Sequence, residues 1–273
     1  MKSPKVKARL TGYYTKIEDA TDISFFFTEA LQGGGRGFLQ EILTGSDRLH
    51  FGAELGVEYQ VTPTIKLKAA ASIGQYTYDN NPDLFITSTS SNFLARNIGP
   101  NGEIETANYL GKSALKDYKL ANGPQNAAQF GFEYRDPKFW WVGATANYFS
   151  NAYIDVSPLA RTSNFGQDLD GLPFNDYDES VARELLRQEQ FDDYMLFNVV
   201  GGKSWKVGKN YIGLFASINN VFNKQYKTGG FEQARGADYR ASLEEAQRQT
   251  PIFGPRYFYG FGTSYYLNVY LRF

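Results

Sequence analysis

The fold is decided by residues 49–61, which read LHFGAELGVEYQV. Apolar residues occupy the odd positions of this stretch, and polar, charged or glycine residues occupy the even positions. Because side chains alternate across a β-strand, one face of such a strand is apolar and the other is polar. A run of this length therefore predicts a strand that separates an apolar environment from a polar one.

The same period of two recurs outward from this stretch in both directions. It predicts eight strands, at residues 5–14, 49–61, 65–73, 128–135, 139–150, 194–205, 210–221 and 256–273. Tight turns are expected at residues 62–64, 136–138 and 206–209, and long loops near 18–48, 79–127, 151–193 and 222–255. Compact soluble domains rarely carry such long loops. Short turns on one side and long loops on the other are typical of an antiparallel, up-and-down transmembrane β-barrel with its long loops outside the cell.

The composition supports this fold class and excludes several functions. The 273 residues include 20 Tyr, 22 Phe and 27 Gly, yet the mean hydropathy is −0.44. No apolar run is long enough for a membrane-spanning helix. With no cysteine and one histidine, the chain offers no thiol catalysis, Cys-ligated zinc, multi-His metal site or Ser-His-Asp system. We therefore expect no enzyme activity, no catalytic residue, no metal and no cofactor, and the net charge of −1 argues against nucleic acid as a partner.

The chain is expected to be a single β-barrel segment over residues 1–273. Met1-Lys2-Ser3-Pro4-Lys5 leads directly into alternating sequence, without the apolar core of a signal peptide. An outer-membrane barrel must be exported, so we expect a mature chain or a portion of a longer protein, and favour the portion.

Three loop segments have helical patterns. Residues 179–188 predict a short helix with Val181 and Leu185 on one face. Ser242 and Glu245 have the spacing of a capping box. Residues 25–31 precede a glycine run and predict a helix with a glycine stop.

The carboxyl terminus carries the most specific signal. The chain ends in an aromatic residue preceded by apolar residues at every second position: Tyr265, Leu267, Val269, Leu271 and Phe273. This pattern resembles the signal read by the machinery that inserts barrels into the outer membrane, since it gives the last strand an unbroken lipid face. The alternative is an edge strand that happens to end in Phe.

A second motif lies just before the last strand. Residues 214–226 read LFASINNVFNKQY, and the segment before the last strand reads GPRYFYGF at residues 254–261. Both resemble the penultimate strand and final approach of TonB-dependent outer-membrane receptors, in the style of the Bacteroidetes group. The matching residues are Asn220, Val221, Phe222, Asn223, Lys224 and Tyr226. The resemblance is specific over residues 210–273 and architectural before them.

The resemblance implies a 22-stranded barrel with a plug domain, of which eight strands are about the last third. It implies import of a scarce nutrient (siderophore, vitamin, oligosaccharide or peptide) across the outer membrane of a Gram-negative bacterium. The implied partners are membrane lipid, the barrel-assembly machinery, and a plug and TonB system through a missing N-terminal part. No plug or TonB-contacting segment is visible in this sequence.

Other motifs have simpler interpretations. The acidic run at residues 168–179 is better explained as a solvated loop than as a calcium site, because its glycine is misplaced for an EF-hand. The glycine-rich residues 33–37 lack the Lys-Ser/Thr of a phosphate loop. Trp140 and Trp141 are expected in the aromatic girdle near a periplasmic turn. His50 is expected in the lumen, without a catalytic partner.

Charged residues predicted on the lumen side are expected to contact a plug or to guide substrate: Lys5, Lys7, Arg9, Glu54, Glu58, Lys66, Lys68, Glu133 and Arg135. Loop aromatics are substrate-contact candidates, with none preferred: Tyr109, Phe149, Tyr153, Phe165, Phe174, Tyr177, Phe231 and Tyr239. The substrate-binding residues are not defined by the sequence.

Three alternatives stay open. A self-contained eight-stranded barrel would act as a small porin, adhesin or structural protein. Its lumen would be filled by side chains, whereas small inward residues favour a wider barrel: Gly52, Gly56, Ala70, Ser72, Gly74, Gly131 and Gly143. An outer-membrane hydrolase would need a nucleophile–base pair that the sequence does not show. A soluble β-sandwich would bury the aromatic rows between two sheets.

Overall fold

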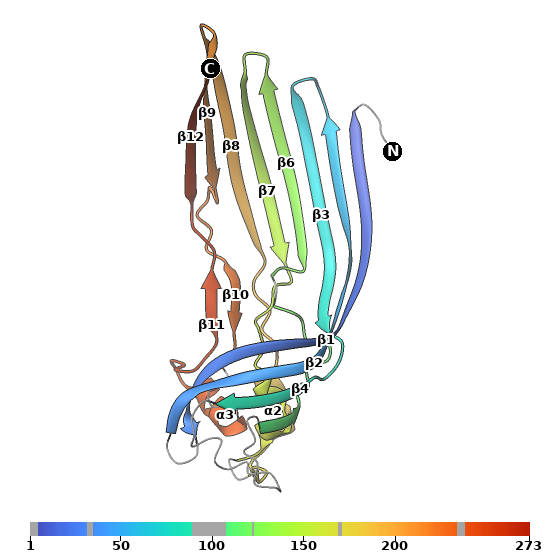
Figure 1. The fold of residues 1–273 in the computed structure, drawn as a ribbon, viewed down its shortest axis with the longest axis vertical. Coiled ribbons are helices and arrows are strands. Elements are labelled where there is room, and N and C mark those ends of the chain that lie inside the picture. The colour runs from blue at the N-terminus through green and yellow to red at the C-terminus, as the bar shows by residue number, and fades with distance from the viewer. Residues whose placement is uncertain (1–4, 32–34, 89–107, 122, 169–170, 234–237) are drawn as a thin grey trace.

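The computed structural model describes residues 5–31, 35–88, 108–121, 123–168, 171–233 and 238–273. A ten-stranded antiparallel sheet dominates it, in the order β12-β9-β8-β7-β6-β3-β2-β4-β5, with β1 paired to β2 (Figure 1). Its strands are β1 (Val6–Leu31), β2 (Gly35–Gln60), β3 (Ile65–Tyr78), β4 (Asp83–Ser88), β5 (Asn108–Lys112), β6 (Asn126–Asp136), β7 (Trp140–Ser150), β8 (Tyr194–Val207), β9 (Asn210–Asn219) and β12 (Ser264–Arg272). A separate ribbon joins β10 (Lys227–Phe231) to β11 (Arg256–Tyr259).

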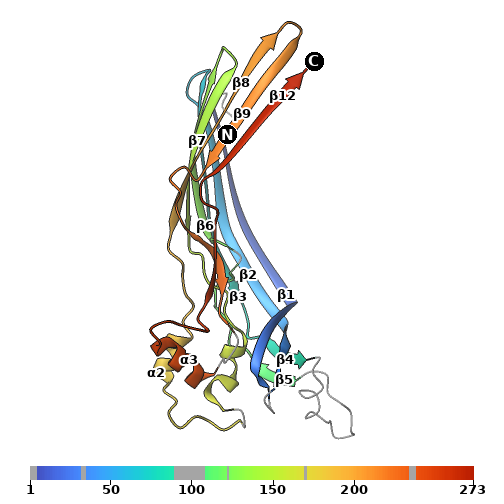
Figure 2. The same ribbon diagram turned by 90° about the vertical axis from the view of Figure 1, so that its left-hand side faces the viewer.

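Eight long strands run up and down in sequence order, which confirms the predicted fold class. Tight turns join β2 to β3, β6 to β7 and β8 to β9 at one end of the sheet, where β1 begins and β12 ends (Figure 1). The long connections and all the helices gather at the other end, which we call the loop end (Figure 2).

The strand registers give the sheet two faces of opposite character. On one face, Phe130 of β6 lies opposite Ala69 and Ala146, and Leu214 lies opposite Val269. On the other, Glu133 lies opposite Lys66 and Gly143. We call these the apolar face and the polar face. The small residues predicted to point inward are on the polar face: Gly52, Gly56, Ala70, Ser72, Gly74, Gly131 and Gly143.

Tyrosines cover some of these glycines. The Tyr270 ring lies over Gly213, where an added Cβ would come within 2.0 Å of it. Tyr13 lies over Gly52 and Gly74 and shares a 2.5 Å hydrogen bond between hydroxyls with Tyr76. These glycines are required because the rings rest directly on the backbone.

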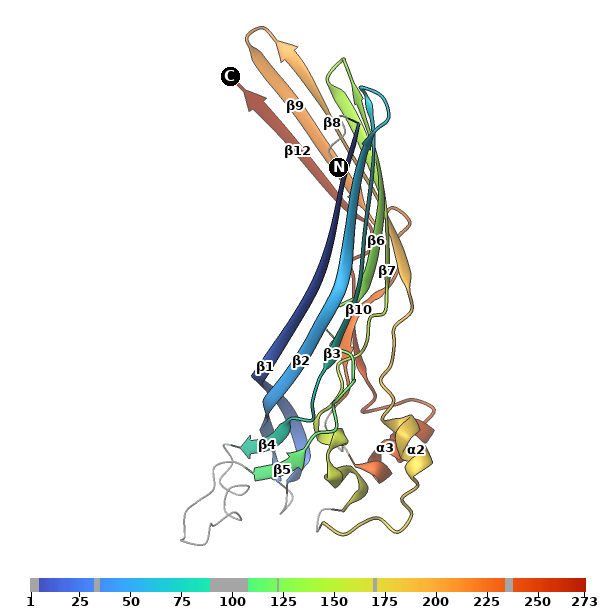
Figure 3. The same cartoon turned by 90° about the vertical axis from the view of Figure 1, so that its right-hand side faces the viewer.

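The sheet is open. Within the described residues, β1 pairs only with β2 and β12 pairs only with β9, so each presents one unpaired edge. The curved sheet does not bring these two edges into register with one another (Figures 2 and 3).

The predicted loop at residues 18–48 was wrong, because β1 and β2 continue through it as an antiparallel arm. The arm bends across the loop end after register shifts near Ala20, with Asp19 and Gly45 at positive φ (Figure 3). The helix predicted at residues 25–31 is likewise strand. An isolated helix of that length is unstable in water, whereas pairing with β2 satisfies the backbone. β4 and β5 extend the sheet from the arm.

Two further corrections concern the C-terminal third. The strand predicted over residues 256–273 is split into β11 and β12 at Gly260, whose amide bonds the Tyr226 carbonyl at 3.0 Å. Helix α3 (Tyr239–Gln247) begins after Asp238, whose carboxylate accepts the Ala241 amide at 2.8 Å, so Ser242 is not its cap. Helix α2 (Glu179–Leu185), capped by Asp178, was predicted correctly.

The buried core lies at the loop end. One cluster joins Leu43 and Leu84 of the arm and β4 to Leu115 and Val156. A second packs the short helices η1 (Leu159–Arg161) and η2 (Ser163–Gly166) against α2 and α3. No helix in the described part of the chain is long and apolar enough to cross a membrane.

Candidate functional site

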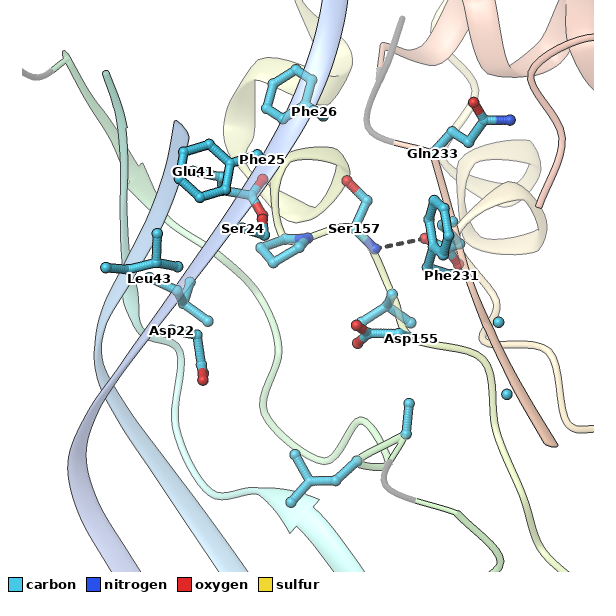
Figure 4. A pocket seen from close by; sticks show the side chains of 18 of the residues that line it. Asp22, Ser24, Phe25, Phe26, Glu41, Leu43, Asp155, Ser157, Phe231 and Gln233 are labelled. Carbon is cyan, nitrogen blue, oxygen red and sulfur yellow. Dashed lines mark hydrogen bonds between the residues drawn. The ribbon is translucent and has the colours of Figure 1, made fainter. Parts of the chain in front are cut away.

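A cavity of about 990 Å³ lies at the loop end where three segments meet. Figure 4 shows the β1–β2 arm on one side, the chain at Asp155–Ser157 in the middle and Phe231 of β10 on the other. Asp155 forms a parallel bridge with Phe231, and its amide bonds the Gly230 carbonyl at 2.9 Å. Residues distant in sequence therefore form one site.

Register determines which side chains of the arm point into this site. Asp22, Ser24 and Phe26 lie opposite Leu43, Glu41 and Leu39. Leu39, Glu41 and Leu43 are all buried, while the intervening residues are partly exposed. A carboxyl group thus lies between two leucines on the inner face of the arm. The sequence LQEIL gives no period-two signal for this arrangement, because the charged Glu41 is on the buried side and the apolar Ile42 is on the partly exposed side.

Two of the four carboxyl groups that line the cavity are paired with arginines. Asp22 bonds the Arg48 guanidinium. Glu232 accepts two hydrogen bonds from the Arg161 guanidinium, from Nη1 to Oε2 at 2.5 Å and from Nη2 to Oε1 at 2.9 Å. Ser157 donates its amide to the same Glu232 Oε2 at 3.0 Å (Figure 4). These pairings fix the position of both carboxylates.

Arg161 holds the site together. Its side chain is 1% exposed and also donates to the Ser157 carbonyl at 3.1 Å and the Leu186 carbonyl at 2.9 Å. The guanidinium carbon lies 4.8 Å from the centre of the Tyr118 ring. One arginine therefore connects η1, the end of α2 and the segment after β10.

The other two carboxyl groups lack such pairing. Glu41 is 5% exposed, accepts a 3.1 Å hydrogen bond from Ser24, and its Oε2 has no partner among the described residues. Burial raises the pKa of Glu41 to about 7, against the lowering effect of the Ser24 hydrogen bond. Burial, followed by the nearby Glu232 and Asp22 carboxylates, raises the pKa of Asp155. No cation in the described residues lies within ion-pair distance of either group.

The rest of the lining is apolar and aromatic. Phe231 of β10 and Phe258 of β11 have ring centres 5.9 Å apart, and both rings are about half exposed. Leu43 and Val156, which belong to one buried cluster, contribute aliphatic surface to the lining. The arrangement suits a molecule with an apolar body and a polar group.

The motif residues at 220–226 lie elsewhere and form a turn. Asn220 and Asn223 have positive φ values of 49° and 51°. The Asn220 side chain donates to the Lys224 and Phe261 carbonyls and accepts the Lys224 amide at 2.8 Å. Asn223 accepts the Thr263 amide at 3.0 Å. This turn ties the end of β9 to the start of β12.

The aromatic members of the motif support the same turn. Phe222 packs edge-on against Phe197, with ring centres 5.0 Å apart. Tyr226 stacks on Tyr194 at 4.4 Å and lies over Gly260. Val221 bonds the Phe197 carbonyl through its amide. The motif therefore braces the sheet rather than facing the cavity.

The C-terminal pattern lies on the apolar face of the edge strand. Tyr265, Leu267, Val269 and Leu271 are each at least 59% exposed, and Phe273 is 96% exposed. Leu267 lies opposite Ala216, and Val269 opposite Leu214. The row is continuous, and its role as an insertion signal stays a prediction.

The charges predicted on the lumen side lie on the polar face and partly pair with one another. Lys68 and Arg135 both contact Glu133, at 2.8 Å and 2.6 Å, and Lys66 lies 3.6 Å from Glu58. His50 lies beside Tyr76, with ring centres 5.0 Å apart.

The tryptophan pair is divided between the two faces. Trp141 lies opposite Arg135 on the polar face, and the Arg135 guanidinium stacks over its ring at 5.4 Å. The prediction of both rings in a lipid-facing girdle was therefore wrong for Trp141, because adjacent strand residues point to opposite faces. Trp140 is on the apolar face, beside Tyr134.

Of the eight loop aromatics, Phe231 lines the large cavity. Phe165 and Tyr239 are buried in the helical cluster, with Phe174 packed against it and Tyr177 beside Tyr239. The others lie elsewhere: Tyr109 contacts Asp83, Phe149 stacks on Tyr194, and Tyr153 follows β7.

No group of three or more metal-ligating side chains is found in the described residues. The acidic run includes a turn in which Asp168 accepts the Leu172 amide at 2.9 Å, and a helix cap at Asp178. Residues 169–170, and 33–34 of the glycine-rich run, lie outside the described residues.

No protein-family model matches this chain, and no curated protein matches it. The solved structures that are similar to it include these three. The copper transporter OprC is 15% identical with a TM-score of 0.47, and the match covers 99% of this chain and 29% of OprC. The siderophore receptor PiuA from Acinetobacter baumannii is 15% identical with a TM-score of 0.44, over 86% of this chain and 26% of PiuA.

BauA, the ferric preacinetobactin receptor from Acinetobacter baumannii, is 10% identical with a TM-score of 0.35, over 98% of this chain and 34% of BauA. The chain thus spans about a third or less of the length of each of these proteins.

Proposed function

We propose that this chain forms part of the wall of a TonB-dependent outer-membrane receptor that takes up a scarce nutrient. The observation that carries the proposal is the division of eight up-and-down strands into one apolar and one polar face, with tight turns at one end and long loops at the other. The motif at residues 220–226 and the C-terminal pattern point to this family within the barrels.

The apolar face has the character of a lipid-contacting surface. Leu10 is 74% exposed, Phe130 56% and Leu267 66%, although each is on a strand within a sheet. Apolar surface in contact with water is unfavourable in free energy, whereas contact with lipid chains in a bilayer removes this cost. The strands β6, β7, β9 and β12 have 11, 11, 10 and 9 residues, which matches a tilted membrane crossing.

The polar face is proposed to line the lumen. Its glycines and ion pairs leave a broad surface, and the two open edges require strand partners, because unpaired backbone groups are not tolerated in lipid. A wider barrel completed by further strands meets this need. The plug, TonB system, assembly machinery and nutrient are the partners that the proposal includes. It assigns no chemical step to the chain.

A self-contained eight-stranded barrel is the alternative, and it requires β1 to pair with β12. In the described residues these edges are not paired. A passive pore made this way would admit small solutes without TonB.

Epitope insertion tests the orientation. One tag is placed after Leu172 in a long loop, and a second after Gly208 in a tight turn, in the protein expressed from its own reading frame. Antibody should label the loop tag on intact cells and the turn tag only after permeabilisation. Labelling of both tags, or of neither, on intact cells in an outer-membrane-fractionated protein contradicts the proposal.

Transport is tested separately. Cells with the gene deleted should lose growth on one scarce nutrient, and TonB inactivation should reproduce the defect. Solute conductance and growth that are independent of TonB would support the passive eight-stranded barrel instead.

A further inference from the structure

We propose that the cavity between the β1–β2 arm and β10 binds an organic cation, an ammonium or guanidinium group on an apolar body, through Glu41 and Asp155. The inference rests on the proposed function, since it names the substrate class that the receptor would take at its loop end. The site combines residues from the arm, the segment after β7 and the β10–β11 ribbon.

The charges of the lining select the sign of the ligand. Four carboxyl groups and one guanidinium, Arg48, line the cavity. Asp22 is paired with Arg48, and Glu232 is paired with Arg161 from behind the lining. Glu41 and Asp155 have no ion-pair partner among the described residues. An anion in this cavity would meet uncompensated carboxylates, whereas a cation would pair with them.

Glu41 gives independent support for a missing partner. Glu41 is 5% exposed, and its Oε2 makes no hydrogen bond of normal geometry among the described residues, although the Leu159 backbone lies near enough to lower the pKa of the carboxyl group. Buried polar groups in folded proteins are almost always satisfied, so an orphaned oxygen at a cavity marks a place where a ligand donor fits. In Figure 4 Glu41 lies beside Ser24 and faces the segment at Ser157 across the site.

The shape of the site describes the rest of the ligand. A volume of about 990 Å³ is at the upper end of the range for small-molecule sites. Phe231 and Phe258 present half-exposed rings, which bind apolar surface and attract cations to their faces. A bare metal ion would leave these walls without a partner, and no group of three or more side chains able to hold a metal ion occurs in the described residues.

The test measures binding to the full protein, purified from outer membranes in detergent. The probe is N-benzoyl-argininamide, a guanidinium on an aromatic body, and its partners are the neutral N-benzoyl-citrullinamide and the anionic N-benzoyl-glutamate. Calorimetry at pH 8, where the Glu41 carboxyl group is ionised, should show saturable binding of the cation, at least tenfold tighter than that of the neutral compound, and no binding of the anion.

Two variants locate the site. Asp155→Asn and Glu41→Gln should each weaken binding of the cationic probe about tenfold, since each removes one charged hydrogen-bond acceptor. Asp192→Asn is the matched control, because Asp192 is exposed and lies outside the cavity. Circular dichroism and thermal melting verify that each variant retains its fold. If one cavity variant fails to fold, the other decides.

Three results would overturn the inference: no saturable binding of the cationic probe, equal binding of the neutral compound, or equal loss in the control. Failure of the proposed function gives a different pattern. Binding that follows the variants, in a protein that supports no TonB-dependent uptake, would contradict the receptor role and keep the cation site. TonB-dependent uptake by a protein that does not bind the cationic probe would contradict the cation site and keep the receptor role.

Discussion

Replacing Glu41 with Gln should make the loop end more stable at alkaline pH. The pKa of Glu41 is about 7 in the folded chain and 4.5 without burial. This difference of about 2.5 pH units corresponds to about 3 kcal/mol, at about 1.4 kcal/mol per unit. The protonated carboxyl is the form that folding favours. The stability is therefore fully present below pH 4.5, falls as the pH rises, and is lost above 7.

Between about pH 5.5 and pH 8 the expected loss for the natural chain is about 2 kcal/mol, or about 25-fold in the local opening equilibrium. The Gln side chain keeps the Ser24 hydrogen bond and does not titrate in this range. Other ionisable groups line the same cavity as Glu41: Asp22, Arg48, Tyr78, Asp155 and Glu232. The comparison between natural chain and variant cancels their contribution to first order.

Hydrogen–deuterium exchange of residues 38–43 and 155–160, corrected for intrinsic rates, measures this effect in the purified protein. Protection in the natural chain should fall by about 25-fold over that pH range. Protection in Glu41→Gln should not change over this pH range. The exposed control Glu184→Gln should show the same pH-dependent fall in protection as the natural chain. Parallel pH profiles for Glu41→Gln and the natural chain would refute the assignment of a buried, titrating Glu41.

Three further outcomes are expected. Arg161→Met should destabilise the loop end by about 3 kcal/mol, because it leaves Glu232 without its buried partner, and limited proteolysis should then cut near η1. Asn220→Ala should lower the free energy of unfolding by about 2 kcal/mol, measured by thermal melting, since it removes three side-chain hydrogen bonds and leaves alanine at a positive φ that asparagine tolerates better. Val269→Lys on the apolar face should reduce heat-modifiable protein in the outer membrane, at a cost of about 2–4 kcal/mol near mid-bilayer, whereas Asn268→Lys on the polar face should not; equal levels would contradict the orientation of β12.

The strands could be predicted because the alternation that defines their faces is local. Adjacent strands pair so that their apolar residues lie on the same face of the sheet, and the alternation therefore also restricts the register between them. The arm was missed because its alternation is interrupted near Asp19 and Gly45, where positive φ values shift the phase. A pattern that changes phase at a bulge resembles a loop when scanned with a fixed period.

The cavity could not be predicted, because its walls come from distant parts of the chain: Asp155 lies 133 positions after Asp22, and Glu232 lies 77 positions after Asp155. No local pattern brings Asp155 beside Phe231. Glu41 between Leu39 and Leu43 is anomalous only once the structure shows that this face of the arm is buried. The motif at 220–226 was recognised, but its role as a turn became clear only from the hydrogen bonds of Asn220.

The unpaired outer edges of β1 and β12 have a consequence for assembly. Each of the eight long strands pairs with the preceding or following long strand, so the tight hairpins β2–β3, β6–β7 and β8–β9 can form locally and then pair across the long connections. In the part of the chain that the structure describes, the outer edges of β1 and β12 have no neighbouring strand in this order. We expect the pairing of these two edges to be the slow step of assembly. Until it occurs, each edge can pair with a strand of another molecule and cause aggregation.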